Sequence, residues 1–351
     1  MACPRAKLNT MPDKAGVAVL GTGWVSGEHI KAFQQNPHTE VIAILSRERE
    51  RAEAKAREFA LPNCRAYTDL AELLASDAIG IVAICTPHHL HVEQAIACAE
   101  AGRHVLIEKP IALDLEGLRS LRAAIHKARV KSLASFVLRW NPLLETIQSM
   151  LAQQLIGDLY YAEVDYLNAI GPSYSGYQWI IKQQYGVSSL LTAGCHAVDA
   201  LRWFLRREAL EVFAYSNCSQ RNPRRFEYPP NTVAVIKFAG GITGKVASSL
   251  ECDMPYTFNI ELLGDEGAIR NNQVFSRRWP GQNAWATIPT VLPDSGDVTH
   301  HPFLAEINHF VDCILSDRES HCNVADAYRT HELCLAADLS AREGSPIRLP
   351  L

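Results

Sequence analysis

The feature that most limits the fold of this sequence is a series of short apolar runs separated by amphipathic stretches. From Gly16 onward, the apolar runs lie at 16–20, 41–45, 79–85, 104–107 and 132–138. Each run is apolar throughout, which is typical of strands buried on both faces of a parallel sheet. The stretches between them predict helices over 48–60, 69–75, 91–101 and 113–128. Repeated strand–helix units of this length predict an α/β domain of the Rossmann type, with a doubly wound parallel sheet.

The pattern changes after residue 138. A predicted helix over 142–154 is followed by strand-like segments at 159–168, 231–252 and 258–271, with further helices near 195–207, 303–315 and 325–341. Turn residues between the strand-like segments predict an α+β domain with an antiparallel sheet. Because 351 residues exceed the usual size of one domain, we expect three parts. They are a loose lead-in over 1–15, a Rossmann domain over 16–138 and a second domain over 139–351, whose last helix is able to pack back on the first domain.

Charge and composition exclude several classes of protein. The net charge is −4 with acidic and basic residues mixed along the chain, so nucleic acid is not an expected partner. No stretch reaches the roughly 18 apolar residues that span a bilayer, and residues 1–15 lack the apolar core of a secretory signal. The ten cysteines are irregularly spaced without a CxxC pair, which favours a reducing, cytoplasmic location.

A glycine-rich turn directly follows the first predicted strand, in the run GTGWVSGEH at 21–29. Gly21 allows a tight turn, and Gly23 allows the backbone to approach a pyrophosphate at a helix N-terminus. Ser26 occupies the usual place of a third glycine, and Gly27 follows it. With a strand before it and strand–helix units after it, the turn predicts dinucleotide binding. The residues expected to hold the pyrophosphate are Gly21, Thr22, Gly23, Trp24 and Val25.

The end of the second predicted strand bears on the choice between NAD and NADP. An acid there usually binds the ribose 2′-hydroxyl of NAD, but this chain has Ser46 and Arg47. A hydroxyl and a guanidinium suit a 2′-phosphate, since arginine binds phosphate in a bidentate manner. NADP is therefore slightly favoured over NAD. The alternative is that Arg47 stacks on the adenine or faces solvent.

Five motifs together resemble the glucose–fructose oxidoreductase/inositol dehydrogenase/MocA family over about residues 15–350. They are GTGWVSGEH (21–29), CTPHHLH (85–91), HVLIEKP (104–110), GVSSLLTAGCHAVD (186–199) and ADLSAREGSPIRL (337–349). The resemblance implies a second domain with a large, mostly antiparallel sheet that binds substrate and pairs chains into a homodimer or homotetramer. It also implies hydride transfer between NAD(P) and a hydroxyl-bearing carbon of a sugar, glycoside or cyclitol.

Lys109 and His196 are the expected catalytic residues. Lys109 follows a buried strand at the carboxyl edge of the sheet, where ligands bind in open α/β folds. A cation there stabilises a developing alkoxide, and the resemblance implies that Glu108 and Lys109 face the nicotinamide ribose. The resemblance also aligns His196 with the family's proton acceptor, and the ordinary histidine pKa near 6.5 suits that role.

The remaining part of the expected cofactor site is the loop at 86–91. Thr86, Pro87 and His91 match the loop that the family places under the nicotinamide. The cluster His88-His89-Leu90-His91 is not expected to bind metal, because no further Cys or His pair with ligand spacing accompanies it.

The sequence departs from the family four residues before His196. Many members have an acid there, whereas this chain has Thr192, a hydroxyl that gives weaker support to an imidazolium. Asp199 lies on the same helical face as His196 and is able to orient its ring, although a structural role is at least as well supported. For substrate contacts, the sequence suggests Arg139, Trp179 and Lys182, and more speculatively Tyr166, because aromatic and charged groups suit sugars; aromatic residues are equally common in cores.

Two alternative functions remain open from the sequence. One is an NAD-dependent glycoside hydrolase or lyase, in which a retained cofactor briefly oxidises a ring hydroxyl. The missing acid at Thr192 leaves room for such chemistry. The other is a non-catalytic cofactor-binding regulator, which the presence of Lys109 and His196 makes less favoured.

Overall fold

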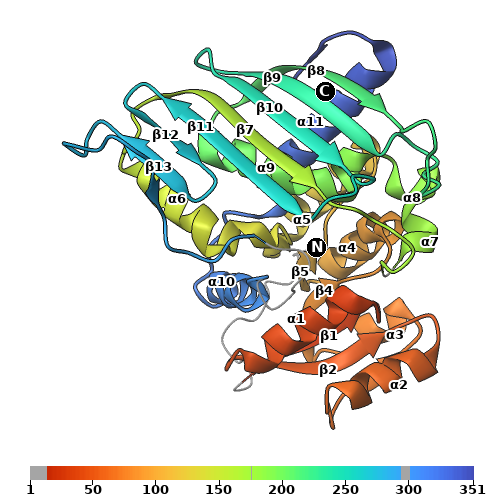
Figure 1. Cartoon of the computed structure of the whole chain (residues 1–351). Coiled ribbons are helices and arrows are strands. Elements are labelled where there is room, and N and C mark those ends of the chain that lie inside the picture. The colour runs from red at the N-terminus through yellow and green to blue at the C-terminus, as the bar shows by residue number, and fades with distance from the viewer. Residues whose placement is uncertain (1–13, 175, 294–300) are drawn as a thin grey trace. The chain divides into compact units, whose positions relative to one another are not determined.

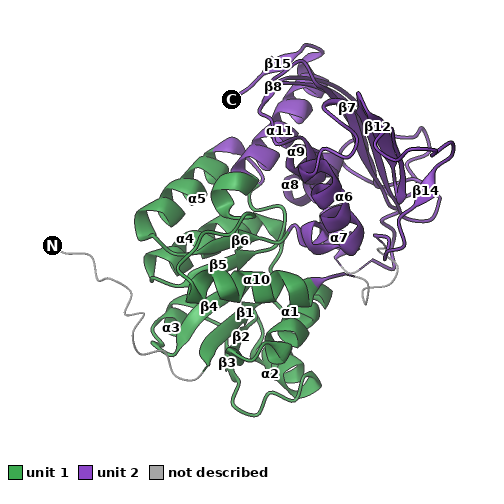
Figure 2. Ribbon diagram, turned by 90° about the vertical axis from the view of Figure 1, so that its left-hand side faces the viewer, with its two compact units in different colours: residues 1–112, 116–135, 303–327 green, residues 113–115, 136–302, 328–351 purple. Residues whose placement is uncertain are grey.

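The computed structural model describes residues 14–174, 176–293 and 301–351. The chain divides into two compact units, coloured separately in Figure 2. Unit 1 comprises 1–112, 116–135 and 303–327, and unit 2 comprises 113–115, 136–302 and 328–351. The lead-in expected over 1–15 lies almost wholly outside the described residues.

Unit 1 is built on a six-stranded parallel sheet with the order β3-β2-β1-β4-β5-β6. Its strands are β1 (Ala15–Leu20), β2 (Thr39–Leu45), β3 (Arg65–Tyr67), β4 (Ile79–Ile84), β5 (His104–Ile107) and β6 (Ser132–Ala134). Its main helices are α1 (Trp24–Gln35), α2 (Arg49–Glu58), α3 (Leu70–Leu74), α4 (His91–Glu100), α5 (Leu115–Ala128) and α10 (Phe303–Leu315). The predicted Rossmann fold is confirmed.

The apolar runs became strands because each is buried on both faces of the sheet. All six residues of β1 are buried, as are all four of β5. The predicted strand over 132–138 is too long, because β6 ends at Ala134 and residues 137–140 form the short 3₁₀ helix η2 (Val137–Trp140). An apolar run alone does not distinguish a buried strand from a buried helical turn.

Helix α10 belongs to unit 1 although it lies about 170 residues after β6 in the chain. A long insertion between two contacting segments costs little additional entropy, so such a distance is compatible with a stable unit. It packs against α1, where Asn36 Nδ2 donates to Asn308 Oδ1 at 2.8 Å. The Phe303 ring meets the His29 ring edge-on at 5.0 Å between centroids. The sequence boundary after 138 assigns this helix to the second domain, whereas the contacts assign it to the Rossmann unit (Figure 2).

Unit 2 is built on a nine-stranded sheet with the order β14-β13-β12-β11-β7-β10-β9-β8-β15. Only the β7–β10 pair is parallel, so the predicted, mostly antiparallel sheet is confirmed. The strands are β7 (Leu159–Leu167), β8 (Ala209–Asn217), β9 (Asn231–Phe238), β10 (Thr243–Ser249), β11 (Thr257–Gly264), β12 (Gly267–Arg270), β13 (Gln273–Ser276), β14 (Ala286–Thr287) and β15 (Ile347–Arg348).

The helices of unit 2 gather on one face of this sheet (Figures 1 and 2). They are α6 (Pro142–Ala152), α7 (Tyr177–Ile180), α8 (Gln183–Gly186), α9 (Cys195–Leu205) and α11 (Val324–Glu343). Strand β9 alternates between buried residues toward this face and half-exposed ones such as Val233 and Val235 on the other. No helix in the described part of the chain is long and apolar enough to cross a membrane.

Candidate functional site

The glycine-rich turn of unit 1 has the geometry of a phosphate cradle. Gly21 has a φ of +104°, and a Cβ there would lie 2.5 Å from the Cys85 carbonyl oxygen. Gly23 precedes the first turn of α1, and a Cβ there would meet no atom within 4 Å, which leaves space for a ligand. No acid stands in that first turn, so the free N–H groups and dipole of the 12-residue helix suit an anion. These residues fit a dinucleotide pyrophosphate.

The packing role of a third glycine is divided between two residues. Ser26 is buried, and its Oγ donates to the Gly23 carbonyl at 2.6 Å, which fixes the turn from within. A Cβ on Gly27 would lie 2.9 Å from Phe59 Cζ, so Gly27 allows α1 to pack closely on the end of α2. The departure from the usual glycine spacing is thereby explained.

Ser46 and Arg47 stand at the carboxyl end of β2, beside the cradle. The Gly21 N–H donates to the Leu45 carbonyl at 2.8 Å, which ties the turn to this strand end. Ser46 is buried and its N–H donates to Tyr67 O at 3.0 Å, whereas Arg47 is exposed. Burial and the charge of Arg47 lower the pKa of His89, so Arg47 lies within electrostatic reach of the loop after β4.

His91 connects the loops that follow β4 and β5. Its ring is fully buried, with Nδ1 2.8 Å from Pro110 O and Nε2 2.8 Å from Thr86 O. Burial lowers the pKa of His91, and the two carbonyl contacts oppose that fall only in part. Thr86 Oγ1 donates to Gln94 Oε1 at 2.6 Å. His91 thus links Thr86, after β4, to Pro110, after β5, and both ring nitrogens face backbone carbonyls.

Glu108 and Lys109 directly follow β5. Lys109 is half-buried, whereas the Glu108 carboxylate is turned inward, with Oε1 2.8 Å from Nε2 of the fully buried His29. Glu108 Oε2 also accepts from the Lys109 N–H at 3.2 Å. Burial opposes ionisation of Glu108, but the bond and charge of His29, the charge of Lys109 and a bond from Ser135 hold its pKa below the ordinary value.

His196 lies in the first turn of α9, in unit 2. The helix is preceded by the single π-helical turn η3 (Leu190–Gly194), a feature often found at functional sites. The imidazole is largely buried, stacked on Tyr166 at 6.0 Å and edge-on to Phe136 at 5.8 Å between centroids. A Cβ on Gly194 would lie 2.6 Å from Ser248 Cβ, so this glycine gives close access to strand β10.

Thr192 joins a buried hydrogen-bond network. Its Oγ1 donates to Gly186 O at 2.8 Å and lies 3.1 Å from the Tyr228 hydroxyl, which donates to Ile180 O at 2.9 Å. Burial raises the pKa of Tyr228, which keeps the phenol neutral. The hydroxyl that replaces the family's acid thus links the π-turn to α7 and α8.

Asp199 and Arg139 form a buried ion pair. Arg139 Nε donates to Asp199 Oδ2 at 2.7 Å and Nη2 to Oδ1 at 2.6 Å, with side chains 3% and 2% exposed. Thr330 Oγ1 adds a bond to Asp199 Oδ1 at 2.9 Å and itself accepts from Arg202 at 2.7 Å. For Asp199, this favours the structural alternative that the sequence left open. The ion pair gives Arg139 a structural partner, and its expected substrate contact stays a prediction.

Trp179 and Lys182 lie at the two short helices of unit 2. The Trp179 indole folds over Gly176, whose φ is +89° and whose Cβ would lie 2.6 Å from Trp179 Nε1. Lys182 is exposed, and its Nζ donates to Glu227 Oε1 at 2.6 Å. Both remain predictions as substrate contacts, and Lys109 and His196 belong to different units, so their common action is also a prediction.

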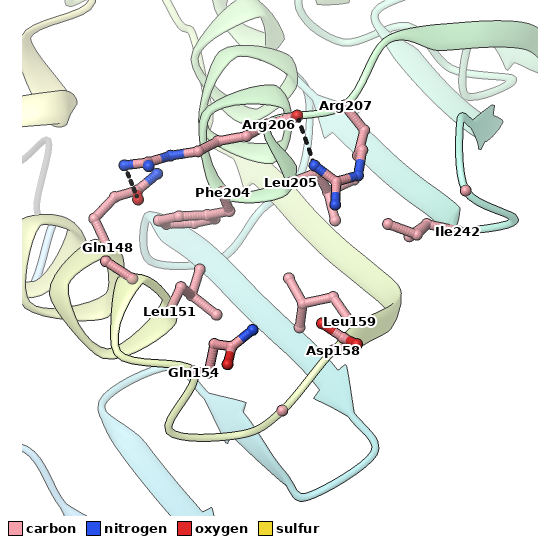
Figure 3. Close-up of a pocket in the computed structure, with 13 residues that line it drawn as sticks. Gln148, Leu151, Gln154, Asp158, Leu159, Phe204, Leu205, Arg206, Arg207 and Ile242 are labelled. Carbon is pink, nitrogen blue, oxygen red and sulfur yellow. Dashed lines mark hydrogen bonds between the residues drawn. The ribbon is translucent and has the colours of Figure 1, made fainter.

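A pocket of about 360 Å³ in unit 2 lies away from these residues (Figure 3). Its lining includes the apolar Leu151, Leu159 and Phe204 and the charged Arg206 and Arg207. Figure 3 shows Arg206 directed toward Gln148, to whose Oε1 it donates at 3.1 Å, while Arg207 donates to Arg206 O. These arginines serve the C-terminal end of α9, and the pocket contains no predicted site residue.

Four buried residues of the two units were not identified from the sequence: His29, Glu306, Tyr228 and Asp338. Burial raises the pKa of Asp338 to about 7, although a bond from Ser188, two residues before the π-turn, opposes the rise. Local patterns gave no signal for any of them, since their partners come from distant segments. Among the described residues, no three His, Cys, Asp or Glu side chains gather as metal ligands.

The comparisons agree with this architecture. Residues 15–136 match the oxidoreductase family with an NAD-binding Rossmann fold, and residues 144–270 match the GFO/IDH/MocA C-terminal domain. An uncharacterized oxidoreductase of Synechocystis is 34% identical over 191 residues, which cover 53% of this chain and 50% of that relative. The scyllo-inositol 2-dehydrogenase (NAD(+)) of Bacillus subtilis is 24% identical over 343 residues, 97% of each chain.

Solved structures support the fold. Levoglucosan dehydrogenase, in complex with NADH and levoglucosan, has a TM-score of 0.87 at 22% identity, and the match covers 96% of this chain and 100% of that one. The first matched segment falls mostly in unit 1, and the second falls in unit 2. The chain therefore belongs to the GFO/IDH/MocA family of NAD-binding oxidoreductases.

Proposed function

We propose that the protein transfers a hydride between a nicotinamide cofactor and a hydroxyl-bearing carbon of a sugar, glycoside or cyclitol. One observation of unit 1 carries this proposal. The cradle follows β1 and Lys109 follows β5, and only β4 lies between these parallel strands. A phosphate site and an amine thus share the carboxyl edge of one sheet, where ligands bind in open α/β folds. The dehydrogenase names of the relatives support the substrate class.

In this proposal, each residue has a distinct task. Gly21, Gly23 and the first turn of α1 hold the pyrophosphate. The cofactor, when bound, supplies the hydride acceptor or donor. Lys109 binds the reacting oxygen and stabilises its negative charge, and His196 accepts the hydroxyl proton during oxidation or returns it during carbonyl reduction.

A cofactor titration followed by a substrate panel tests the proposal. We expect NADH or NADPH to bind, and a polyol or its ketone to change the nicotinamide absorbance in a net reaction. Binding with no redox change, together with release of an aglycone from glycosides, would instead indicate a glycoside hydrolase or lyase that retains its cofactor. Cofactor binding with neither a net redox change nor aglycone release would indicate a non-catalytic cofactor-binding regulator.

We propose that NADP is preferred over NAD, with Ser46 and Arg47 at the 2′-phosphate. Arg47 is exposed at the end of β2, and its charge reaches His89 in the loop after β4, so a cation is present at this strand end. In Arg47→Gln, the dissociation constant of NADPH should rise about 10–100-fold, since a hydrogen bond between charged groups contributes about 1.5–3 kcal/mol. That of NADH should change by less than about threefold, because no phosphate is present.

The matched control for this prediction is Arg57→Gln, which removes an arginine of α2 whose side chain is 71% exposed. It should leave both dissociation constants unchanged, as measured by nicotinamide fluorescence. Equal weakening of NADH and NADPH in Arg47→Gln would instead support stacking of Arg47 on the adenine.

We further propose a cytoplasmic homodimer or homotetramer that pairs through the nine-stranded sheet. The sheet face away from the helices carries Tyr215, Val233 and Val235, with exposures of 70%, 48% and 50%. Such an apolar group is typical of an interface. None of the nine cysteines that the structure describes forms a disulfide, which supports a reducing compartment. Sedimentation velocity should give a mass of two or four chains; a single chain would contradict the pairing.

A further inference from the structure

A chain of buried polar groups lies behind Lys109 within unit 1. His29 comes from α1, Glu108 follows β5, Ser135 follows β6 and Glu306 comes from α10. His29 and Glu306 are 0% exposed, Ser135 is 1% exposed and Glu108 is 8% exposed. Two carboxyl groups, one imidazole and one hydroxyl are therefore buried together in unit 1.

Ser135 is the link between the two acids. Its Oγ lies 3.1 Å from Glu306 Oε2, and it also hydrogen-bonds to Glu108. Beyond Ser135, Glu108 is held by His29 at 2.8 Å and by the Lys109 N–H. In contrast, Glu306 Oε1 has no hydrogen-bond partner among the described residues.

The number of protons shared by Glu306, Ser135 and Glu108 determines the charge of Glu306. A serine hydroxyl has one hydrogen, so it donates to one carboxylate only. If Glu108 and Glu306 were both ionised, one of the two carboxylates would face a lone pair of the Ser135 oxygen, and that contact would be repulsive. If Glu306 carries a proton, it donates to Ser135, Ser135 donates to Glu108, and both hydroxyl hydrogens have an acceptor. The remaining Oε1 is then a carbonyl oxygen, whose burial costs far less than that of a charge.

We propose that Glu306 is a neutral carboxylic acid that positions Glu108, and through it Lys109, by way of the Ser135 hydroxyl. Glu306 is thereby a positioning residue and touches no reacting atom. It orients the Ser135 hydrogen toward Glu108, which keeps Glu108 ionised and its Oε2 directed at the Lys109 N–H. The catalytic part of this inference rests on the function proposed for Lys109.

The electrostatic surroundings favour one ionised acid, Glu108, and one protonated acid, Glu306. Burial, followed by the charge of Glu108, raises the pKa of Glu306 well above its ordinary value. A bond donated by Ser135 would oppose this rise, but in the proposed arrangement Ser135 donates to Glu108 instead. The same two acids, after burial, raise the pKa of the Cys85 thiol, which keeps it neutral. The titratable groups that face the cluster are thus His29, Cys85, His91, Glu108 and Lys109. When two carboxyl groups share a site, one stays ionised and the other stays protonated.

Infrared spectroscopy tests the protonation state without any substrate. The difference spectrum between the wild type and Glu306→Gln at neutral pH should contain the carbonyl stretch of a protonated carboxylic acid, lost in the variant. Its absence, with a carboxylate band lost instead, would overturn the proposal. This result is independent of whether a sugar is ever turned over.

The pH dependence of unfolding gives a second test. Because the pKa of Glu306 is raised in the folded chain, its contribution to stability is complete below its ordinary pKa of 4.5 and is lost as the pH rises above that value. Over this range, the unfolding constant of the wild type should increase about tenfold per pH unit relative to Glu306→Gln. Parallel stability curves would show that Glu306 is ionised in the folded protein.

Turnover tests the positioning role. Glu306→Leu should lower kcat about tenfold with little change in substrate KM, because Lys109 is displaced slightly and substrate binding is not. Glu306→Gln should recover most of this loss, since its amide also donates to Ser135. The matched control, Asn308→Ala, removes the bond between α10 and Asn36 without touching the four groups. An equal kcat loss in this control would overturn the proposal in favour of helix packing.

Discussion

Replacing Lys109 by methionine is expected to lower kcat about a thousandfold, equivalent to about 4 kcal/mol of transition-state stabilisation. The methionine side chain has nearly the same length but carries no charge, so the developing alkoxide loses its cation. The affinity for NAD(P)H should change by less than about threefold, because the pyrophosphate is held at the other end of the cofactor by backbone groups. Single-turnover kinetics and nicotinamide fluorescence measure the two effects separately.

Two further variants define the origin of that loss. Lys127→Met removes an exposed lysine at the end of α5 and should leave kcat unchanged. Lys109→Arg keeps the charge but presents a planar fork instead of a point charge, so only part of the activity should return. If Lys109→Met retained kcat and lost only cofactor affinity, the amine would have no role in the chemistry.

The sequence predicted the part of the site that depends on local geometry. Gly21 and Gly23 follow a buried strand, and the structure gives them the open cradle that their spacing indicated. Lys109 was placed correctly at a strand end because parallel strands all present their carboxyl ends at one edge. Both inferences needed only a strand, a turn and the residue after it.

The rest depends on contacts between distant segments. Asp199 and His196 both lie in α9, but helical spacing did not reveal Arg139, 60 residues away, as the partner of Asp199. Glu306 lies 171 residues from Ser135, and no periodicity in the sequence predicted that α10 packs in unit 1. The pairing of buried charges is decided by tertiary packing, which a one-dimensional pattern does not encode.

The Arg139–Asp199 pair carries the largest stability prediction. Asp199→Asn keeps the shape of the side chain but removes its charge, so the guanidinium remains buried without a counter-ion. We expect the free energy of unfolding to fall by about 3–5 kcal/mol, the usual cost of breaking a buried ion pair from one side. Urea denaturation followed by circular dichroism measures this loss.

A double variant separates the two parts of that cost. In Arg139→Met with Asp199→Leu, both charges are removed together, and apolar side chains of similar size fill the space between η2 and α9. Because desolvation opposes the attraction within a buried pair, this variant should be more stable than Asp199→Asn. Thr330 would lose one acceptor, which limits the recovery. A double variant less stable than Asp199→Asn would show instead that the pair itself stabilises unit 2, and a loss below about 1 kcal/mol in the single variant would show that water reaches Arg139.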